Sequence, residues 1–272
     1  TFSLAITPVD GAPYTLSATK SNVTVSAGDP YEIHLTQEPS DLIAGEAFSP
    51  AAKVEIQDRW ANIVTAGTQS LKVSLITDDS VSGSVTLVQA ETATVTTANG
   101  VGTITNPAFT KAGTYKMQVT DAAGILVQEL SQSFDIPAGN PAAAVWVAGG
   151  TVSGAVSRSA LSDQPEVEIQ DAYGNRALTD STTVITLAAE AVDGNGQVNT
   201  TNGQTLRVTN GRANYSAFTI GAKAANYRLI ISTATNSNGF TVTPTATKSG
   251  QFAITNGAAA SVRVATAAAS AK

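Results

Sequence analysis

One phrase occurs twice in this chain, and its repetition constrains the fold more than any other feature. "VEIQDRWAN" runs from Val54 to Asn62, and "VEIQDAYGN" runs from Val167 to Asn175. In each copy the alternating apolar residues predict a strand, and the polar residues that follow predict a turn. A catalytic signature is needed once per site, whereas a strand and turn repeated in tandem indicate a copied building block. The chain is therefore expected to contain units of one common plan.

Further strands recur in the same order along the chain. A strand with one aromatic and two apolar residues at alternate positions occurs three times, as Phe2, Leu4 and Ile6, as Tyr115, Met117 and Val119, and as Tyr227, Leu229 and Ile231. Since alternate residues of a strand face one side, each set is expected to face a core. The strands "SFDI" and "QFAI" follow, and the Asn-Gly pairs of "ANGV" and "TNGR" suit tight hairpins. No segment has a convincing helical pattern, so the chain is predicted to be all-β.

The order of the repeats predicts where the units begin and end. Gly-containing junctions, "AGDP", "AGNP" and "TNGA", separate the copies. Residues 1–27 are expected to be the last two strands of a preceding unit, and residues 257–272 the first strand of a following unit. Residues 28–139 and 140–256 are expected to be two whole units. Units of this length with about seven strands each are typical of immunoglobulin-like β-sandwiches.

The bulk composition excludes several classes of function. Charged residues make up 13% of the 272 residues and the net charge is −6, so nucleic acid is an improbable partner. The absence of cysteine excludes disulfides, thiolate metal sites and a thiol nucleophile. No apolar run approaches the roughly 20 residues that span a bilayer, so this segment is not expected to insert into a membrane. Because the sequence opens with Thr1, it is interpreted as a processed or excised piece.

These phrases carry a family resemblance. The "VEIQDAYGN" turn, the later Asn-Gly hairpin and the strands "NYRLII" and "QFAIT" resemble the tandem immunoglobulin-like repeats of bacterial cell-surface proteins, including invasin- and intimin-type adhesins and surface-layer proteins. The resemblance covers nearly the whole chain and implies an extracellular, cell-surface location with neighbouring immunoglobulin-like units, or other copies of the chain, as partners. It allows a calcium ion between units, and it names no ligand. Ala61 stands where the second copy has Gly174, which puts the geometry of the first turn in question.

Asp58 and Asp171 are expected to cap their turns. A carboxylate at the start of a type I turn accepts backbone N–H bonds, and a following glycine suits the left-handed position. The alternative role of metal ligand or catalytic acid lacks a second carboxylate or a histidine at ligand spacing in either phrase. Trp60 and Tyr173 occupy equivalent places inside these turns. They are expected to pack against an adjoining unit or to contact a partner such as a glycan.

His34 is the single histidine, so histidine-based proton transfer would have to use it. Alignment of "YEIHLT" with "AAVWVA" places His34 level with Trp146. Both are then expected on the exposed face of a strand, because apolar residues flank them on either side. Trp146 becomes a third candidate for partner contact. Without a converging polar constellation, an enzyme is the weakest class.

Two further kinds of site have weaker signals. "DGNGQ" spaces Asp193 and Asn195 as oxygen ligands of calcium are spaced, but a later acidic residue is missing and a polar hairpin is the preferred interpretation. Asn22, Asn199 and Asn214 open N-x-[ST] triplets, which makes them candidate glycosylation sites. Such triplets also arise by chance in Thr-rich strands.

The leading hypothesis is a non-enzymatic structural protein of a microbial exterior, either a surface-layer segment or an adhesin stalk. A second hypothesis is an extracellular filament in which the tail strand of one subunit completes the head of the next. A third is a glycan-binding module that uses Trp60, Tyr173 or Trp146 as a stacking platform.

Overall fold

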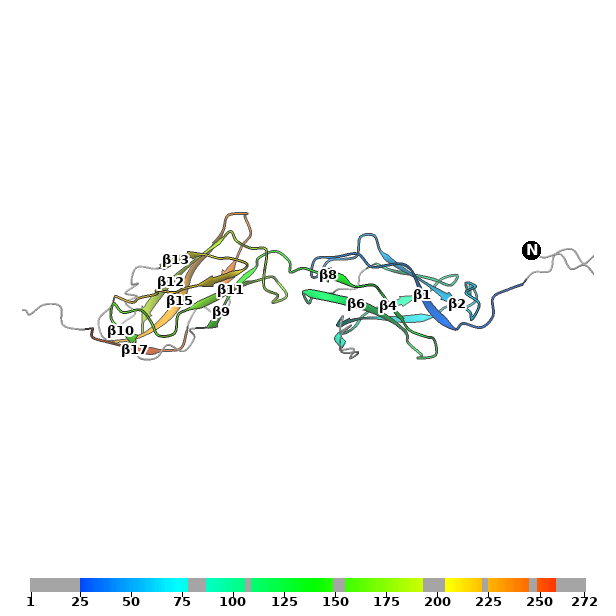
Figure 1. Cartoon of the computed structure of the whole chain (residues 1–272), viewed down its shortest axis with the longest axis horizontal. Coiled ribbons are helices and arrows are strands. Elements are labelled where there is room, and N and C mark those ends of the chain that lie inside the picture. The colour runs from blue at the N-terminus through cyan, green and yellow to red at the C-terminus, as the bar shows by residue number, and fades with distance from the viewer. Residues whose placement is uncertain are drawn as a thin grey trace, which may run out of the picture. The chain divides into compact units, whose positions relative to one another are not determined.

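The computed structural model describes residues 25–77, 87–105, 109–148, 155–192, 204–221, 225–244 and 249–257. It divides into two compact units, a first of Thr1–Phe109 with Gly113–Ile136 and a second of Thr110–Ala112 with Pro137–Lys272. The described residues form strands and no helix, as the alternating sequence predicts (Figure 1). The predicted partial units, residues 1–27 and 257–272, lie almost wholly outside the described residues and stay predictions, as do the predicted limits 28–139 and 140–256.

The first unit pairs its strands into two sheets. One sheet has the antiparallel order β1-β2-β5, with β1 Glu32–Gln37, β2 Ala52–Gln57 and β5 Val101–Ile104. The other has the order β4-β3-β6-β7, and β8 also pairs with β6. Its strands are β3 Ser70–Thr77, β4 Leu87–Thr96, β6 Gly113–Asp121, β7 Glu129–Leu130 and β8 Phe134–Ile136.

The second unit repeats this division with additional short strands. One sheet has the order β14-β11-β9-β16, with β9 Ala143–Ala148, β11 Glu166–Gln170, β14 Arg212–Asn214 and β16 Thr243–Pro244. The other has the order β10-β17-β15-β12-β13, with β10 Ala155–Val156, β12 Thr183–Ala191, β13 Gln204–Arg207, β15 Ala225–Asn236 and β17 Phe252–Thr255. Most pairs are antiparallel, while β10–β17 and β16–β9 are parallel. Two mainly antiparallel sheets that alternate inward and outward residues are the architecture of immunoglobulin-like sandwiches.

Each unit has its own hydrophobic core. Tyr115 lies opposite Phe134 in the β6–β8 pair, and Tyr227 lies opposite Phe252 in the β15–β17 pair. All four side chains are buried, as are the predicted inward residues Met117, Val119, Leu229 and Ile231. The predicted core faces of these strands are therefore confirmed. Phe2, Leu4 and Ile6 lie outside the described residues.

The two Asn-Gly hairpins are confirmed and have the same backbone. Asn99 and Gly100 have φ of 50° and 78°, and Asn210 and Gly211 have φ of 49° and 71°. Two consecutive positive φ values are the mark of a type I′ turn. A Cβ at Gly100 would lie 2.5 Å from the carbonyl oxygen of Val64, so glycine is required by space as well as by conformation.

The predicted orientation of Trp146 is wrong. Trp146 pairs with Val167, while Leu35 pairs with the matching Val54, so Trp146 corresponds to Leu35 and not to His34. Its side chain packs against the core of the second unit, and Val147 is exposed instead. A slip of one residue in the alignment exchanges the two faces of a strand, which explains the error.

Candidate functional site

The repeated phrase builds a tight turn after β2 in the first unit and after β11 in the second. The N–H of Ala61 donates to the carbonyl oxygen of Asp58 at 3.1 Å, and the N–H of Gly174 donates to that of Asp171 at 3.2 Å. Ala61 has a φ of 61° and Gly174 a φ of 82°. The alanine therefore adopts the left-handed conformation that glycine takes in the second copy, and both turns have the predicted geometry.

The carboxylate of Asp58 holds the first turn and the segment that leads into the unit. Its Oδ1 accepts the backbone N–H groups of Trp60 at 2.9 Å and Asn62 at 3.0 Å. The Asn62 side-chain amide donates to both carboxylate oxygens, at 3.1 and 3.0 Å. Its Oδ2 accepts the N–H of Gly28 at 2.8 Å, thirty residues earlier in the chain. We call this arrangement of Gly28, Asp58, Trp60 and Asn62 the first clasp.

The second unit repeats every one of these donors. Asp171 Oδ1 accepts the N–H of Tyr173 at 2.8 Å and the N–H of Asn175 at 2.9 Å. Its Oδ2 accepts the Asn175 side-chain amide and the N–H of Gly139, both at 2.8 Å. We call Gly139, Asp171, Tyr173 and Asn175 the second clasp. The repeated phrase therefore encodes one polar contact set used twice.

Hydrogen bonding keeps both carboxylates ionised. Asp58 is 1% exposed and Asp171 is 3% exposed. The N–H of Gly28 is the main cause that lowers the pKa of Asp58, to about 2, with Asn62 and Trp60 adding to it against the effect of burial. Burial alone would raise the pKa of Asp171, but the donors from Asn175, Gly139 and Tyr173 outweigh it and lower that pKa.

The clasps are unsuited to acid catalysis or metal binding. N–H donors already occupy both oxygens of each carboxylate, and a general acid needs a pKa near the working pH. In the part of the chain that the structure describes, no group of three or more His, Cys, Asp or Glu residues could hold a metal ion. The structural interpretation of Asp58 and Asp171 is therefore the one that the geometry supports.

The sequence predicted the turn but not the junction glycine that donates to the Asp carboxylate in each clasp. Gly28 and Gly139 stand in the junctions "AGDP" and "AGNP", which the sequence marks only as breaks between strands. The structure binds each junction to the turn of the unit that follows it. The recurrence of a glycine upstream of both Asp turns was the available signal.

The aromatic residues of the two turns differ in exposure. Trp60 is 76% exposed and Tyr173 is 46% exposed. A Cβ at Gly28 would lie 3.4 Å from Cζ3 of Trp60, so the indole stands beside the clasped junction. Their role in partner contact stays a prediction. Trp146, the third candidate, packs against a core, and its indole N–H has no hydrogen-bond partner.

The remaining candidates are placed as follows. His34 is exposed on the outer face of β1, as predicted, with Nδ1 4.0 Å from Oε1 of Glu129. Asn214 is exposed at the end of β14. Asn22, Asp193, Asn195 and Asn199 lie outside the described residues, so the glycosylation and calcium predictions for them stay predictions.

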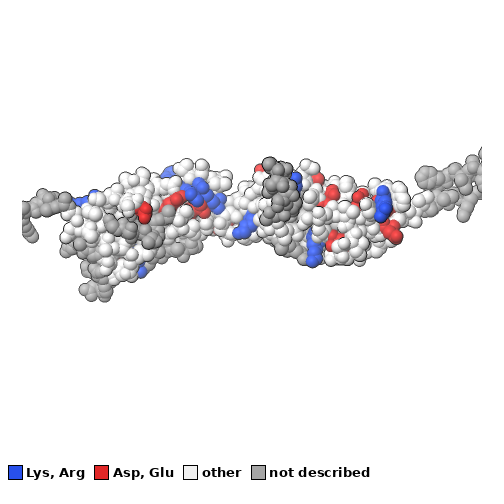
Figure 2. Space-filling model, turned by 60° about the horizontal axis from the view of Figure 1, so that its bottom comes forward, with Lys and Arg blue, Asp and Glu red and all other residues white. Residues whose placement is uncertain are grey.

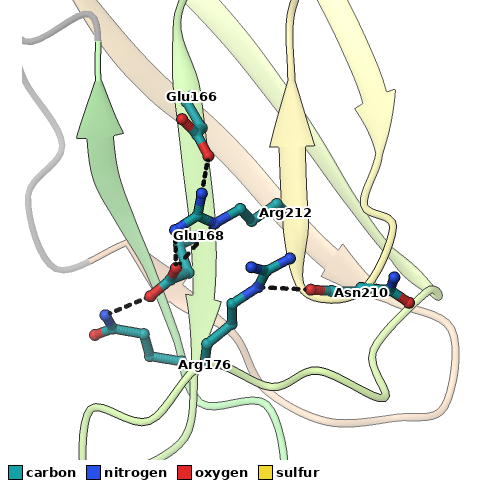
Figure 3. A network of polar contacts seen from close by, with 6 residues as sticks. Glu166, Glu168, Arg176, Asn210 and Arg212 are labelled. Atoms are coloured by element: carbon teal, nitrogen blue, oxygen red, sulfur yellow. Dashed lines mark hydrogen bonds and ion pairs between the residues drawn. The ribbon is translucent and has the colours of Figure 1, made fainter.

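An ion network crosses the outer face of the second unit (Figure 3). Arg212 on β14 donates to Glu166 Oε1 at 2.6 Å and, through Nε and Nη2, to Glu168 Oε2 at 3.1 and 2.9 Å. Glu168 is the main cause that raises the pKa of Arg212. Arg176 donates instead to the carbonyl oxygen of Asn210 at 2.7 Å. Arg212 thus joins β14 to β11, and Arg176 joins the turn after β11 to the hairpin before β14.

Elsewhere in the described residues a second ion pair joins Arg228 Nε to Glu190 Oε2 at 2.7 Å. In the view of Figure 2, isolated basic and acidic groups stand among uncharged residues, and no continuous basic field is present on the described part of this face.

Comparison with known proteins gives no family. No family model matches the chain, and no curated protein matches it. Among solved structures, the FN1–FN3 domains of chicken CNTN1 are 12% identical, with a TM-score of 0.37, over 85% of this chain and 67% of that one. InvD of Yersinia pseudotuberculosis is 15% identical, with a TM-score of 0.30, over 88% and 73%. The adhesin InvE of the same organism is 12% identical, with a TM-score of 0.29, over 82% and 58%.

Similarity at this level assigns neither a family nor an activity to the chain. A search of the described residues for a long apolar helix able to cross a membrane returned none.

Proposed function

We propose that the chain is a non-enzymatic structural module of an extracellular microbial surface protein, a surface-layer segment or adhesin stalk in which serial sandwiches act as stiff spacers. The observation that carries the proposal is the repeated clasp. A site that recognised a ligand would keep free donors or acceptors. In both clasps, backbone N–H groups and an Asn side-chain amide of the same unit already bind the two carboxylate oxygens. Their role is to fix how the chain enters each unit.

The second clasp shortens the free linker between the units. β8 ends at Ile136, and the N–H of Gly139 is already bound to Asp171. Pro137 and Ala138 are the residues left between these two fixed points, and the proline ring fixes one of their dihedral angles. A linker this short and stiff restricts the angles that two sandwiches can adopt.

Parallel strand pairs at the edges of the sandwiches would resist a pulling force applied to the two ends of the chain. In the second unit the early strand β10 pairs in parallel with the last strand β17, and the N–H of Ser157 donates to the carbonyl oxygen of Thr255 at 2.9 Å. When parallel neighbours are pulled in opposite directions, their hydrogen bonds are loaded together rather than one at a time. In the first unit, Glu32 likewise pairs in parallel with Val127.

The stiffness can be tested on the whole chain. Because the chain has no cysteine, Thr103→Cys and Ser237→Cys place one spin label on an exposed position of each unit. Asp171→Ala cuts the second clasp and is expected to broaden the distance distribution between the labels. Asp58→Ala cuts the first clasp, outside the linker, and is the matched control that leaves the distribution unchanged. A parent distribution already as broad as that of Asp171→Ala would sink the proposal.

Glycan binding is the second candidate, favoured by the exposure of Trp60. A glycan array with the parent chain and Trp60→Ala separates it from the spacer role. Binding lost in the variant supports it, and no binding by the parent removes it.

A further inference from the structure

Carboxylate side chains join two segments of the first unit that are far apart in the chain. In each of three hydrogen bonds the partners are 94 residues apart, and successive bonds follow one another at the same spacing on both segments. Residues 35–41 and 129–135 therefore lie side by side and run in parallel. We call these three bonds the carboxylate seam. They join the N–H of Leu35 to Glu129 Oε1 at 3.5 Å, the N–H of Gln132 to Glu38 Oε2 at 3.0 Å, and the N–H of Asp135 to Asp41 Oδ1 at 2.8 Å.

The seam stands where the first unit has no backbone ladder. β1 pairs with β2 and β7 pairs with β6, so the described strands include no ladder between β1 and β7. Backbone bonds meet the seam at its two ends. At one end the N–H of Ile33 donates to the carbonyl oxygen of Val127 at 3.1 Å. At the other end the N–H of Leu42 donates to the carbonyl oxygen of Asp135 at 3.2 Å. Between these ends, the seam joins the two segments through side chains.

The second unit has a backbone ladder at the corresponding place. Its last strand, β17, matches β8 of the first unit and pairs in parallel with β10. Ala155 lies opposite Ile254, and Val156 lies opposite Thr255. The N–H of Ser157 donates to the carbonyl oxygen of Thr255 at 2.9 Å, and the Thr255 hydroxyl donates to the carbonyl oxygen of Ala155 at 3.2 Å. The two units therefore hold their last strands by different means.

A force on the two ends of a unit loads these contacts in shear. Because the paired segments are parallel, the early segment is drawn toward the start of the unit and the late segment toward its end. Backbone bonds between parallel strands are evenly spaced and short, so they take such a load together. A carboxylate stands on rotatable bonds, which let it extend before its hydrogen bond is strained. The bonds of the seam are therefore loaded one after another.

Solvent weakens the seam further. A hydrogen bond to a carboxylate is stronger than one to a neutral acceptor when both are shielded from water. Glu38 and Asp41 are exposed, so water competes for their oxygens, and holding each side chain in one geometry costs conformational entropy. Exposure thus offsets the advantage of charge in the first unit.

We propose that the two units yield to force in a fixed order, with the first unit opening before the second. The proposal rests on the spacer function and adds an extensible element to it. At a force that leaves the second sandwich folded, the first sandwich unfolds and lengthens the spacer, which limits the tension on whatever the chain holds.

Constant-force spectroscopy on the whole chain, held by tags at its two ends, tests the order. Gly and Ser residues inserted in the connection from β3 to β4 mark the first unit, because they lengthen the chain that this unit releases. We expect the marked step to come first and the second unit to survive severalfold longer at the same force. A marked step that comes second, or steps in random order, overturns the proposal.

Variants then test whether the seam causes the order. Glu38→Ala with Asp41→Ala should shorten the lifetime of the first unit under force and leave that of the second unchanged. Glu46→Ala, which removes an exposed carboxylate outside the seam, is the matched control and should change neither. Ser157→Pro removes a donor of the β10–β17 ladder and should shorten the lifetime of the second unit. A lifetime of the first unit that is the same in the double variant and the parent contradicts a load on the seam.

The order of opening and the spacer function fail on different measurements. The spin-label distances report stiffness of the folded chain without force, whereas the order is read only under force. A broad distance distribution therefore removes the spacer function, and a reversed order with a narrow distribution removes this proposal alone.

Discussion

The outer face of β11 and β14 carries Glu168 and Arg212 in the second unit, whereas the paired residues of β2 and β5 are Glu55 and Val101 in the first. The clasps, in contrast, keep the same four partners in both units. Surface residues have therefore diverged where they affect neither chain path nor core. Residues that fix a turn or the start of a unit have the same type in both units. Their side chains accept or donate hydrogen bonds to particular backbone groups, and other side chains would make these bonds less well.

The largest expected effect compares the two cores. Phe109→Ala and Phe218→Ala each remove a ring that is at most 1% exposed. Each should lower the free energy of unfolding of its own unit by about 4 kcal/mol. Urea unfolding followed by hydrogen exchange, peptide by peptide, reads the units separately. If either variant lowered the free energy of unfolding of both units equally, the two units would share one core and could not be compared as separate domains.

Removal of a clasp should cause the second-largest loss in the free energy of unfolding. Asp171→Ala leaves the buried donors of Gly139, Tyr173 and Asn175 without an acceptor, with an expected loss of about 2 kcal/mol in the second unit. Asp58→Ala should act in the same direction on the first unit. The same unfolding measurement checks both, and an effect in the wrong unit contradicts the assignment of each junction to the unit that follows it.

Acid should weaken the clasps through their carboxylates. The folded pKa of Asp58 is lowered from 3.8 to about 2, so its stabilising contribution is present above 3.8 and is lost as the pH falls through about 2. Asp171 is shifted in the same direction. Unfolding of the first unit followed between these pH values should show a slope that Asp58→Asn reduces. An unchanged slope in that variant would assign the acid sensitivity to other carboxylates.

Exchanging the alanine and the glycine between the two turns should change the free energy of unfolding by a smaller amount. Ala61→Gly removes a left-handed alanine and should stabilise the first unit by about 1 kcal/mol, and Gly174→Ala should destabilise the second by a similar amount. Thermal unfolding measures both. Changes of the same sign in the two variants would mean that the turns are not equivalent.

The ion network should contribute least. Arg212→Val copies the residue of the first unit and removes the contacts to Glu166 and Glu168, which are partly exposed. A loss of about 1 kcal/mol or less, shrinking at high salt, is expected in the second unit alone. Measuring the variant at low and high salt separates the charge effect from packing, and an effect independent of salt would contradict it.

Local pattern was sufficient for the strands and turns. Alternation predicted the inward faces of Tyr115 and Tyr227, and the Asp and Asn-Gly signals predicted the turns, because period and turn chemistry act within a few neighbouring residues. The outward position of His34 followed in the same way. These features depend on the sequence by itself.

Partners distant in the chain were decided by the tertiary structure. The orientation of Trp146 depends on strand register, and β9 has a register shift against β11 that no local pattern marks. The Gly28 and Gly139 donors reach carboxylates about thirty residues away, and Arg212 meets Glu166 and Glu168 from another strand. Such contacts arise only after packing has brought the segments together. Every residue except proline carries the same backbone N–H group, so the sequence does not mark which N–H will meet a given carboxylate.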